Sequence, residues 1–251
     1  MASSAAQREI PTDLVFEASS LPTSFEEGAV LLIDKPKGVT SFDVVKAVRR
    51  RVGPSKVGHA GTLDPMATGL LIVLVARPAT RLQEAFMHLP KSYEGTMRLG
   101  EQTPSLDTET EVEHTADISH LSYDDIAAVR DEFTGQINQV PPMYSAVKVD
   151  GEPLYKKARR GETVERAPRQ VRIDSFEVRD WTPPDLTFAV HCSKGTYIRS
   201  LARDVGQALD VGAHLTALRR TAVGEYQAAD AWSLSALTDA LSEVTTDTDE
   251  A

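Results

Sequence analysis

The pattern of apolar and polar residues predicts a chain in which strands and helices are interspersed. Residues 29–34 (AVLLID) predict a buried strand, and the apolar run 70–76 (LLIVLVA) has strand length. Val44, Val45 and Val48 share one helical face, so a helix capped by Ser41 is expected to run to about residue 51. Further strands are expected at 91–100, 170–180, 186–192 and 217–226, and further helices at 79–88, 123–133, 153–161 and 197–209. Hairpin-like strand pairs with interspersed helices favour an α+β fold with a mainly antiparallel mixed sheet rather than a doubly wound fold.

The same pattern suggests how the chain is divided. Residues 1–27 contain Ser, Glu and Pro without periodicity, which predicts a mobile N-terminal arm, with order beginning at Gly28. Residues 28–240 are expected to form one domain, because no internal repeat and no Gly/Ser linker interrupts them. Residues 241–251 are expected to be an acidic C-terminal tail.

Cysteine use and hydropathy narrow the functional classes. The single cysteine, Cys192, excludes an intrachain disulfide and a cysteine-clustered zinc site. Its place in an alternating strand pattern is more typical of a small buried residue than of a nucleophile. No apolar run approaches the roughly 20 residues that span a bilayer. The N-terminal residues MASSAAQREI lack the features of a secretory signal, so a cytoplasmic protein with no membrane partner is expected.

The net charge of −10 at first argues against a nucleic-acid partner, but the charge is unevenly distributed. Residues 1–30 carry a net charge of −4 and residues 225–251 a net charge of −7, which leaves a net charge of +1 for residues 31–224. Three basic clusters lie in that central part: Lys46, Arg49, Arg50, Arg51 and Lys56; Lys156, Lys157, Arg159, Arg160, Arg166, Arg169 and Arg172; and Lys194, Arg199, Arg203, Arg219 and Arg220. One such cluster is usually a solvated helix face, but three together favour a surface that binds RNA phosphates.

Asp64 is the first candidate for chemistry. It lies in the polar segment 58–69 (GHAGTLDPMATG), whose glycines permit unusual backbone conformations and close approach of a ligand. His59 precedes it by five residues, and the following strand can hold the loop rigidly. An Asx-turn formed by Asp64 with Pro65 explains this segment equally well.

Two other segments carry candidate residues. Residues 192–199 (CSKGTYIR) place Tyr197 and Arg199 at a strand-to-helix junction, and an arginine can clamp a carboxylate with two hydrogen bonds. Residues 91–100 (KSYEGTMRLG) offer Tyr93 as a stacking ring, although an aromatic residue in a strand more often belongs to a core.

Taken together, these segments resemble the motifs of the TruB-type tRNA pseudouridine synthases. Residues 34–41 (DKPKGVTS) resemble the first motif of that family, and 58–70 the catalytic motif, whose aspartate falls on Asp64. Residues 91–100 are similar to the tyrosine motif and 192–199 to the arginine motif. Residues 140–161 and 212–223 also match, and the whole resemblance covers about 28–235 in the family's order. Several motifs in order are far more specific than a single short pattern.

The resemblance implies the fold, the reaction and the site. The expected fold is that of the pseudouridine synthases, with a central RNA-binding cleft and residues 28–240 as catalytic domain. The expected reaction converts uridine 55 of the tRNA T-loop to pseudouridine, with no cofactor and no metal. Asp64 is implied as the catalytic carboxylate, Tyr93 as the ring that stacks on the flipped base, and Arg199 as the partner of Asp64. Tyr197 and Leu218 are implied to line the same pocket, and His59 to contact or displace RNA rather than act as general base. The partner is the T-arm stem-loop of tRNA; a monomer with no obligatory protein partner is expected.

Two departures from the family pattern matter. Residues 103–107 (TPSLD) stand where relatives carry TDTxD, which puts the expected RNA contacts of this loop in doubt. Many relatives continue into a C-terminal PUA domain, which is expected to be missing from this short form.

Two alternatives remain open from the residues alone. A metal-dependent hydrolase could use His59, Asp64 and either His88 or His191, although their spacing is not dense. A tRNA-binding module or folding chaperone with secondary modification activity would have the same RNA-binding surface.

Overall fold

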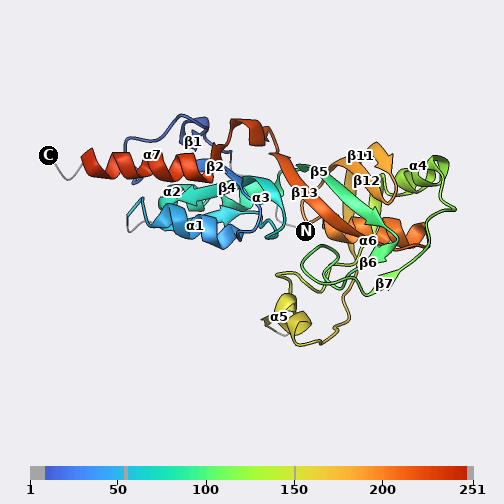
Figure 1. Cartoon of the computed structure of the whole chain (residues 1–251). Coiled ribbons are helices and arrows are strands. Elements are labelled where there is room, and N and C mark those ends of the chain that lie inside the picture. The colour runs from blue at the N-terminus through green and yellow to red at the C-terminus, as the bar shows by residue number, and fades with distance from the viewer. Residues whose placement is uncertain (1–8, 54–55, 150, 248–251) are drawn as a thin grey trace, which may run out of the picture. The chain divides into compact units, whose positions relative to one another are not determined.

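The computed structural model describes residues 9–53, 56–149 and 151–247, and for 244–247 the backbone alone. Its contacts divide the chain into two units (Figure 1). Unit 1 comprises Met1–Lys91 and Arg219–Ala251, and unit 2 comprises Ser92–Leu218. Each unit is described in turn.

Two apolar strands form the centre of unit 1. β2 (Ala29–Lys35) pairs antiparallel with β4 (Thr68–Val75), from Ala29 opposite Val75 to Lys35 opposite Gly69. Both strands are almost continuously apolar because both faces of the sheet are covered, and burial of each large side chain contributes about 1.5–3 kcal/mol. The strand expected at 29–34 is therefore confirmed, and the run at 70–76 belongs to β4.

Shorter strands and helices complete unit 1. They are β1 (Val15–Phe16), β3 (Val57–Ala60), β14 (Tyr226–Gln227), β15 (Trp232–Ser233), α1 (Ser41–Arg49), α2 (Ala76–Thr80), α3 (Gln83–His88), α7 (Leu234–Asp247) and the 3-10 turns Thr12–Leu14 and Ala228–Asp230. β1 and β15 run parallel to β2, and β3 pairs antiparallel with β4. One face of the β2–β4 pair carries Val30 and Leu32, which pack in a cluster with Phe86 of α3.

The structure changes several sequence expectations for unit 1. The N-cap of α1 is Thr40, which forms a capping box with Asp43, so Ser41 is not the cap. The segment expected as the loop 58–69 begins with the strand β3, and the helix expected at 79–88 is divided into α2 and α3. Strand β1 lies within the range expected to be an arm, and α7 extends into the range expected to be a tail.

Unit 2 is built on five strands in the order β13-β5-β12-β11-β8. Their bounds are β5 (Lys91–Leu99), β8 (Gly135–Gln139), β11 (Arg169–Thr182), β12 (Asp185–Cys192) and β13 (Ala213–Val223). The strands expected at 91–100, 170–180 and 186–192 are confirmed as β5, β11 and β12, and β13 begins earlier than expected. Cys192 is buried in β12, as its strand pattern predicted.

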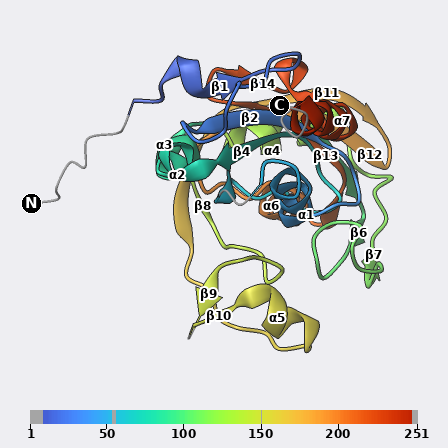
Figure 2. The ribbon, with the colours of Figure 1, turned by 90° about the vertical axis from the view of Figure 1, so that its left-hand side faces the viewer.

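The helices of unit 2 are α4 (Tyr123–Glu132), α5 (Leu154–Arg159) and α6 (Ile198–Ala208), each close to its expected place. Two small strand pairs are added, β6 (Glu101–Gln102) with β7 (His114–Thr115), and β9 (Lys148–Val149) with β10 (Glu152–Pro153). Figure 2 shows that β9, β10 and α5 lie away from the main strands of this unit. In the part of the chain that the structure describes, no helix has both the length and the apolar character needed to cross a bilayer.

Candidate active site

Asp64 lies in the loop between β3 and β4 of unit 1, and its side chain is half-buried. The Asp64 carbonyl accepts a hydrogen bond from the Ala67 amide at 3.1 Å, which closes a turn directly after the aspartate. Asp64 therefore sits on a short turn between two paired strands, a position in which backbone contacts can fix the direction of its side chain.

Residues on both sides of Asp64 are tied to the segment 34–41. Before it, the Ser41 Oγ donates to the Leu63 carbonyl at 3.1 Å and accepts from the Leu63 amide at 2.9 Å. After it, the Pro65 carbonyl accepts from the Gly38 amide at 2.8 Å and from Lys35 Nζ at 3.4 Å. The first motif thus supports the catalytic motif from both directions.

Arg220 holds the two ends of the same loop. Its side chain is 1% exposed, and it donates from Nε to the Leu70 carbonyl at 2.7 Å and from Nη2 to the Gly61 carbonyl at 3.0 Å. Gly61 has a φ of +86°, and a Cβ atom there would lie 3.3 Å from Arg220 Nη1. Glycine at 61 therefore gives the loop both its conformation and room for the guanidinium.

The charges around the loop influence one another. Lys35 is buried beneath it and also donates to the carbonyls of Pro36 and Val39, at 3.0 and 2.8 Å. Burial lowers the pKa of Lys35 from 10.5 to about 8; the negative charge of Asp64 opposes this shift, and Arg220 adds to it. At neutral pH, Lys35 is thus predominantly a cation that interacts electrostatically with Asp64.

His59 lies on β3, five residues before Asp64, and its ring is half-buried. Burial, and then the charge of Arg220, lower its pKa below the ordinary value of 6.5. Its Nδ1 atom is buried and has no hydrogen-bond partner among the described residues. His59 is therefore a neutral ring near pH 7, suited to contact a base or ribose rather than to carry charge.

In unit 2, Arg199 lies in the first turn of α6 and is 4% exposed. Its Nη1 donates to the Ser105 carbonyl at 2.9 Å and its Nη2 to the Tyr144 carbonyl at 2.7 Å. Its Nε lies 3.6 Å from the carboxylate of Asp107, which is also buried. These contacts fix the guanidinium plane, while the pairing of Arg199 with Asp64 stays a prediction.

The loop 103–107, whose RNA contacts the departure from the family pattern put in doubt, lies largely inside unit 2. Thr103, Ser105 and Asp107 are all buried. The Asp107 carbonyl accepts from Thr103 Oγ1 at 2.7 Å and from Ser105 Oγ at 3.2 Å. The loop is therefore an internal support for Arg199, and this role does not require an acidic residue at position 104.

The other expected site residues of unit 2 occupy separate elements. Tyr197 is the residue before α6, where its amide donates to Gln139 Oε1 at 2.7 Å and its ring lies 5.7 Å from the guanidinium of Arg169. Tyr93 is half-buried on β5, and Leu218 is buried on β13. Asp64 and His59 thus belong to unit 1, and the other four expected residues belong to unit 2.

The three basic clusters differ in how much of their charge faces solvent. In the cluster 194–220, Arg199 and Arg220 are buried, Arg203 donates to the Val140 carbonyl at 3.1 Å, and Arg219 pairs with Asp34. The phosphate-binding interpretation was therefore wrong for the two buried residues, Arg199 and Arg220, whose donors bind protein carbonyls. For Arg203 and Arg219, which are partly exposed, it stays a prediction.

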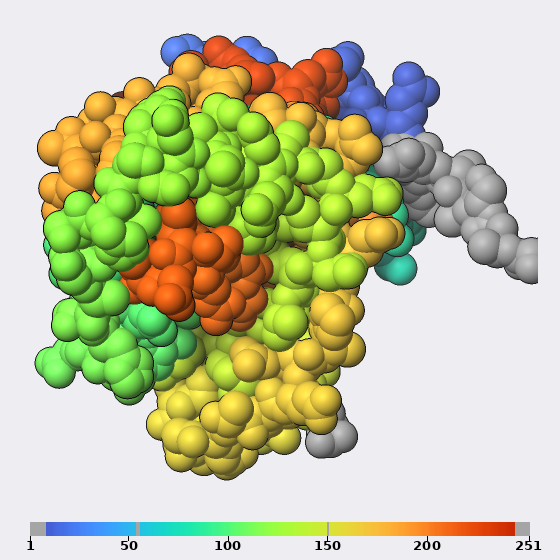
Figure 3. Space-filling view, turned by 90° about the vertical axis from the view of Figure 1, so that its right-hand side faces the viewer, coloured from blue at the N-terminus to red at the C-terminus, as the bar shows by residue number. Residues whose placement is uncertain are grey.

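The cluster 156–172 retains part of its exposed charge. Arg159, Arg160 and Arg172 pair with carboxylates, and Arg166 donates to backbone carbonyls. Lys156 and Arg169 are exposed and form no ion pair in the described part of the chain. Figure 3 shows the segment that carries α5 as a yellow lobe on the surface of unit 2. This lobe is the best candidate for phosphate contacts.

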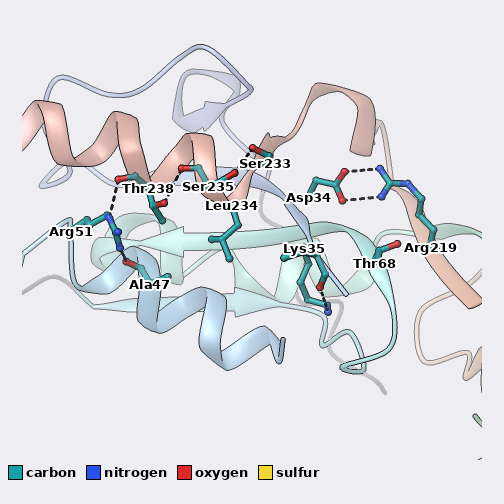
Figure 4. A pocket seen from close by; sticks show the side chains of 11 residues that line it. Asp34, Lys35, Ala47, Arg51, Thr68, Arg219, Ser233, Leu234, Ser235 and Thr238 are labelled. Carbon is teal, nitrogen blue, oxygen red and sulfur yellow. Dashed lines mark hydrogen bonds and ion pairs between the residues drawn. The ribbon is translucent and has the colours of Figure 1, made fainter. Parts of the chain in front are cut away.

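Unit 1 also contains an open hollow of about 630 Å³ (Figure 4). The Asp34–Arg219 ion pair, with two hydrogen bonds of 2.9 and 2.7 Å, forms one part of its wall. Elsewhere in the wall, Arg51, two residues after the end of α1, donates to the Thr238 carbonyl of α7 at 2.9 Å. Asp34, Lys35, Arg51 and Arg219 in Figure 4 are used in contacts within the protein, and the bond from Arg51 to Thr238 connects the end of α1 to α7.

No group of three or more His, Cys, Asp or Glu side chains that could hold a metal ion occurs among the described residues. The hydrolase alternative would use His59 and Asp64 with either His88 or His191, and neither set is brought together in such a group.

Two protein-family models match the chain. Residues 49–198, which include Asp64 and Tyr93, match the N-terminal domain of the TruB family of pseudouridylate synthases. This chain belongs to the TruB family. Residues 199–251 match the C-terminal domain of tRNA pseudouridylate synthase B, so the family match includes α6, β13 and α7. The resemblance inferred from the motifs is confirmed.

Individual TruB relatives extend over most of the chain. The tRNA pseudouridine synthase B of Opitutus terrae is 49% identical over 212 residues, which cover 84% of this chain and 88% of the relative. The protein of the same name from a Mycobacterium species is 50% identical over 216 residues, which cover 84% of this chain and 72% of that relative.

Solved structures confirm the fold. A crystal structure of a Cbf5–Nop10–Gar1 complex is similar with a TM-score of 0.66 and 32% identity over 92% of this chain. A structure of an H/ACA RNP bound to a substrate RNA containing 2′-deoxyuridine is similar with a TM-score of 0.67 and 28% identity over 96% of this chain. This TruB chain spans 60% and 62% of the matched chains in those structures. The α+β fold with a mixed sheet flanked by helices is therefore that of the pseudouridine synthases.

Sequence reasoning missed four residues that shape the site: Lys35, Ser41, Asp107 and Arg220. All four are buried polar residues whose partners are distant in the chain: Lys35, Ser41 and Arg220 bind atoms of the Asp64 loop, and Asp107 pairs with Arg199 of α6. Lys35, Ser41 and Arg220 lie inside the segments 34–41 and 212–223, which the motifs had already identified. That position was the available signal.

Proposed function

We propose that this protein isomerises the T-loop uridine of tRNA, conventionally numbered 55, to pseudouridine, and that Asp64 is its catalytic carboxylate. The relatives named tRNA pseudouridine synthase B support the reaction and the substrate. The observation that carries the role of Asp64 is its loop, which is held before and after the aspartate by Ser41, Gly38 and Lys35.

The chemistry needs a carboxylate held in a fixed direction. The C1′–N1 bond breaks, the uracil turns, and a C1′–C5 bond forms, while C5 loses a proton and N1 gains one. Atoms and electrons balance without an oxidant or a second substrate. The sugar carbon becomes electron-poor, as in glycoside cleavage. Asp64 can attack C1′, or it can remove a proton from C2′ on a glycal route; both uses require an ionised, well-placed carboxylate.

The other residues act on the RNA or on the position of the carboxylate. A uridine inside a loop must be flipped out of its stack, which costs a few kcal/mol. Tyr93 stacks on the flipped base, and such stacking contributes about 1–3 kcal/mol. His59, as a neutral ring, contacts the RNA from which the uridine has left, and Tyr197 and Leu218 contact the nucleotide. Arg199, fixed by Ser105 and Tyr144, is the guanidinium that keeps the carboxylate ionised.

The test is to map pseudouridine in an unmodified tRNA transcript after incubation with the purified protein alone, in the presence of EDTA. Wild type should modify the T-loop uridine, and Asp64→Asn should lose turnover while still binding tRNA, since the amide keeps shape but loses charge. Asp180→Asn makes the same chemical change at an exposed carboxylate on β11 and serves as control.

Each alternative has its own result in this experiment. Loss of wild-type activity on EDTA addition would support the metal-dependent alternative, and tRNA binding without modification would support the binding module. A requirement for a second protein would contradict action by this chain alone. Substantial turnover by Asp64→Asn would remove Asp64 from its proposed role.

A further inference from the structure

Ser41 makes a two-way contact with the residue directly before the catalytic carboxylate. Its hydroxyl donates to the Leu63 carbonyl at 3.1 Å and accepts from the Leu63 amide at 2.9 Å. A hydroxyl can do both because it has one hydrogen and two lone pairs. Ser41 is 2% exposed and Leu63 is also buried, so water does not replace either bond.

The hydroxyl of Ser41 is not needed by its own helix. Thr40 caps α1: Thr40 Oγ1 accepts from the Asp43 amide at 3.0 Å, and the Asp43 carboxylate accepts from the Thr40 amide at 3.1 Å. Two adjacent hydroxyls therefore have different tasks. Thr40 begins the helix, and Ser41 connects the start of that helix to the loop 22 residues later.

The backbone of Leu63 depends on this contact. In the described part of the chain, the two bonds to Ser41 are the hydrogen bonds that the Leu63 amide and carbonyl make. Loss of the hydroxyl leaves a buried donor and a buried acceptor without partners, unless the backbone moves to find new ones. Such a movement would reorient the next residue, which is Asp64.

We propose that Ser41 is a positioning residue for catalysis, which fixes the Leu63 backbone and thereby the direction of the Asp64 carboxylate. The proposal rests on the proposed function of Asp64. Pro65 is held independently by Gly38 and Lys35, so loss of Ser41 frees one side of Asp64 and leaves the other attached. A change of this kind misaligns the carboxylate without unfolding the loop, and a misplacement of about 1 Å lowers a rate by about a hundredfold.

The test compares Ser41→Ala with Thr40→Ala, which removes the neighbouring hydroxyl of the same helix. Single-turnover rates, tRNA dissociation constants, melting temperatures and hydrogen exchange at the Leu63 amide are measured for both. For Ser41→Ala we expect a rate about tenfold to a hundredfold lower, unchanged tRNA affinity and faster exchange at Leu63. For Thr40→Ala we expect a lower melting temperature from the lost cap but an unchanged rate. Ser41→Cys, whose thiol is a weaker donor and acceptor, should give an intermediate rate.

A purely structural role predicts a different pattern. If Ser41→Ala and Thr40→Ala lower the melting temperature alike and both keep the wild-type rate, the positioning role is wrong. Faster exchange at Leu63 with an unchanged rate also contradicts it, because the loop would then have been loosened without effect. Asp64→Asn is measured alongside: an inactive Asp64→Asn with a fully active Ser41→Ala overturns this inference alone, whereas an active Asp64→Asn overturns the proposed function.

Discussion

A Cβ atom placed on Gly69 would lie 2.2 Å from the carbonyl oxygen of Arg220 and 2.8 Å from its amide nitrogen. The two residues are register partners on the parallel strands β4 and β13. Gly69 also has a φ of +99°, which glycine adopts readily and other residues rarely adopt. The absence of a side chain at 69 therefore lets β13 approach the end of the Asp64 loop, where the Arg220 guanidinium reaches Leu70 and Gly61.

Gly69→Ala should consequently destabilise unit 1 and strongly reduce pseudouridine formation. The methyl group cannot be accommodated unless β4 or β13 moves, and backbone strain with overpacking costs about 2–4 kcal/mol. Urea unfolding and single-turnover rates measure the two effects. Gly135→Ala is the matched control, because Gly135 also has a φ of +99° but nothing lies within 4 Å of its added Cβ. Equal losses in the two variants would show that conformation alone, and not the contact with Arg220, requires glycine at 69.

Lys35 predicts an unusual dependence of stability on pH. Burial lowers its pKa in the folded protein to about 8, whereas an unfolded lysine has its ordinary value of 10.5. Between these values the unfolded state binds more protons than the folded state, so the free energy of unfolding rises with pH. The charge on buried Lys35 therefore opposes folding below pH 8, and this opposition disappears as the pH rises from about 8 towards 10.5.

The measurement is urea unfolding across this pH range for wild type and Lys35→Met, which cannot titrate. The free energy of unfolding of wild type minus that of Lys35→Met should rise with pH, by up to about 1.4 kcal/mol per pH unit. In Asp64→Asn the rise should begin at lower pH, because the Asp64 charge opposes the fall in the Lys35 pKa. If the difference in free energy of unfolding does not change with pH, the pKa of Lys35 is not lowered by folding. If the rise begins at the same pH in Asp64→Asn as in wild type, the charges of Lys35 and Asp64 do not interact.

The sequence predicted those parts of the molecule that local patterns determine. The continuous apolar run of β2 was found because both of its faces are buried. The strands β5, β11 and β12 and the helices α1 and α6 were found because burial of one face gives a periodic pattern of apolar residues. The role of Ser41 was not found, because Thr40 and Ser41 are equally good caps by type. The choice between them depends on Leu63, 22 residues later.

Buried charges were the other source of error. Arg199 and Arg220 looked like surface cations because arginines are mostly exposed, but their partners are carbonyls 55–159 residues away in the chain. Helix α7 had a usable pattern, with Leu234, Leu237 and Leu241 at helical spacing, but the acidic composition of its second half favoured a tail. The leucine spacing described the buried side of this helix, where Leu237 and Leu241 lie.

Substitutions at Tyr93 should separate stacking from proton transfer. Tyr93→Phe keeps the ring and loses the hydroxyl, while Tyr93→Ala loses both. If stacking on the flipped base is the main role, the alanine variant should lose about 1–3 kcal/mol of transition-state stabilisation and the phenylalanine variant little. Single-turnover rates at saturating enzyme measure this loss apart from RNA binding. If both variants lose a similarly large part of the single-turnover rate, the hydroxyl of Tyr93 is the group that matters, through proton transfer. If both variants react at nearly the wild-type rate, Tyr93 does not belong to the site.

The last prediction concerns the part of tRNA that the protein recognises. Folded RNA loops are bound through shape, phosphate contacts and splayed bases. Two exposed cations of unit 2 can contact phosphates: Lys156 on α5 and Arg169 at the start of β11. A surface of this kind needs one stem and its loop, so an isolated T-arm hairpin should be modified at a rate comparable to that of whole tRNA.

Binding of the hairpin should weaken steeply with salt, because phosphate neutralisation releases counterions. Lys156→Gln should reduce the slope of log affinity against log salt by about one if Lys156 binds a phosphate. Lys148→Gln, at an exposed lysine of the neighbouring strand β9, tests whether the change in salt dependence is specific to position 156. A hairpin that stays inert while full-length tRNA reacts would mean that recognition depends on contacts outside the T-arm. Separately, if Lys156→Gln leaves the slope of log affinity against log salt unchanged, Lys156 does not bind a phosphate, and the lobe carrying α5 is not the phosphate-binding surface.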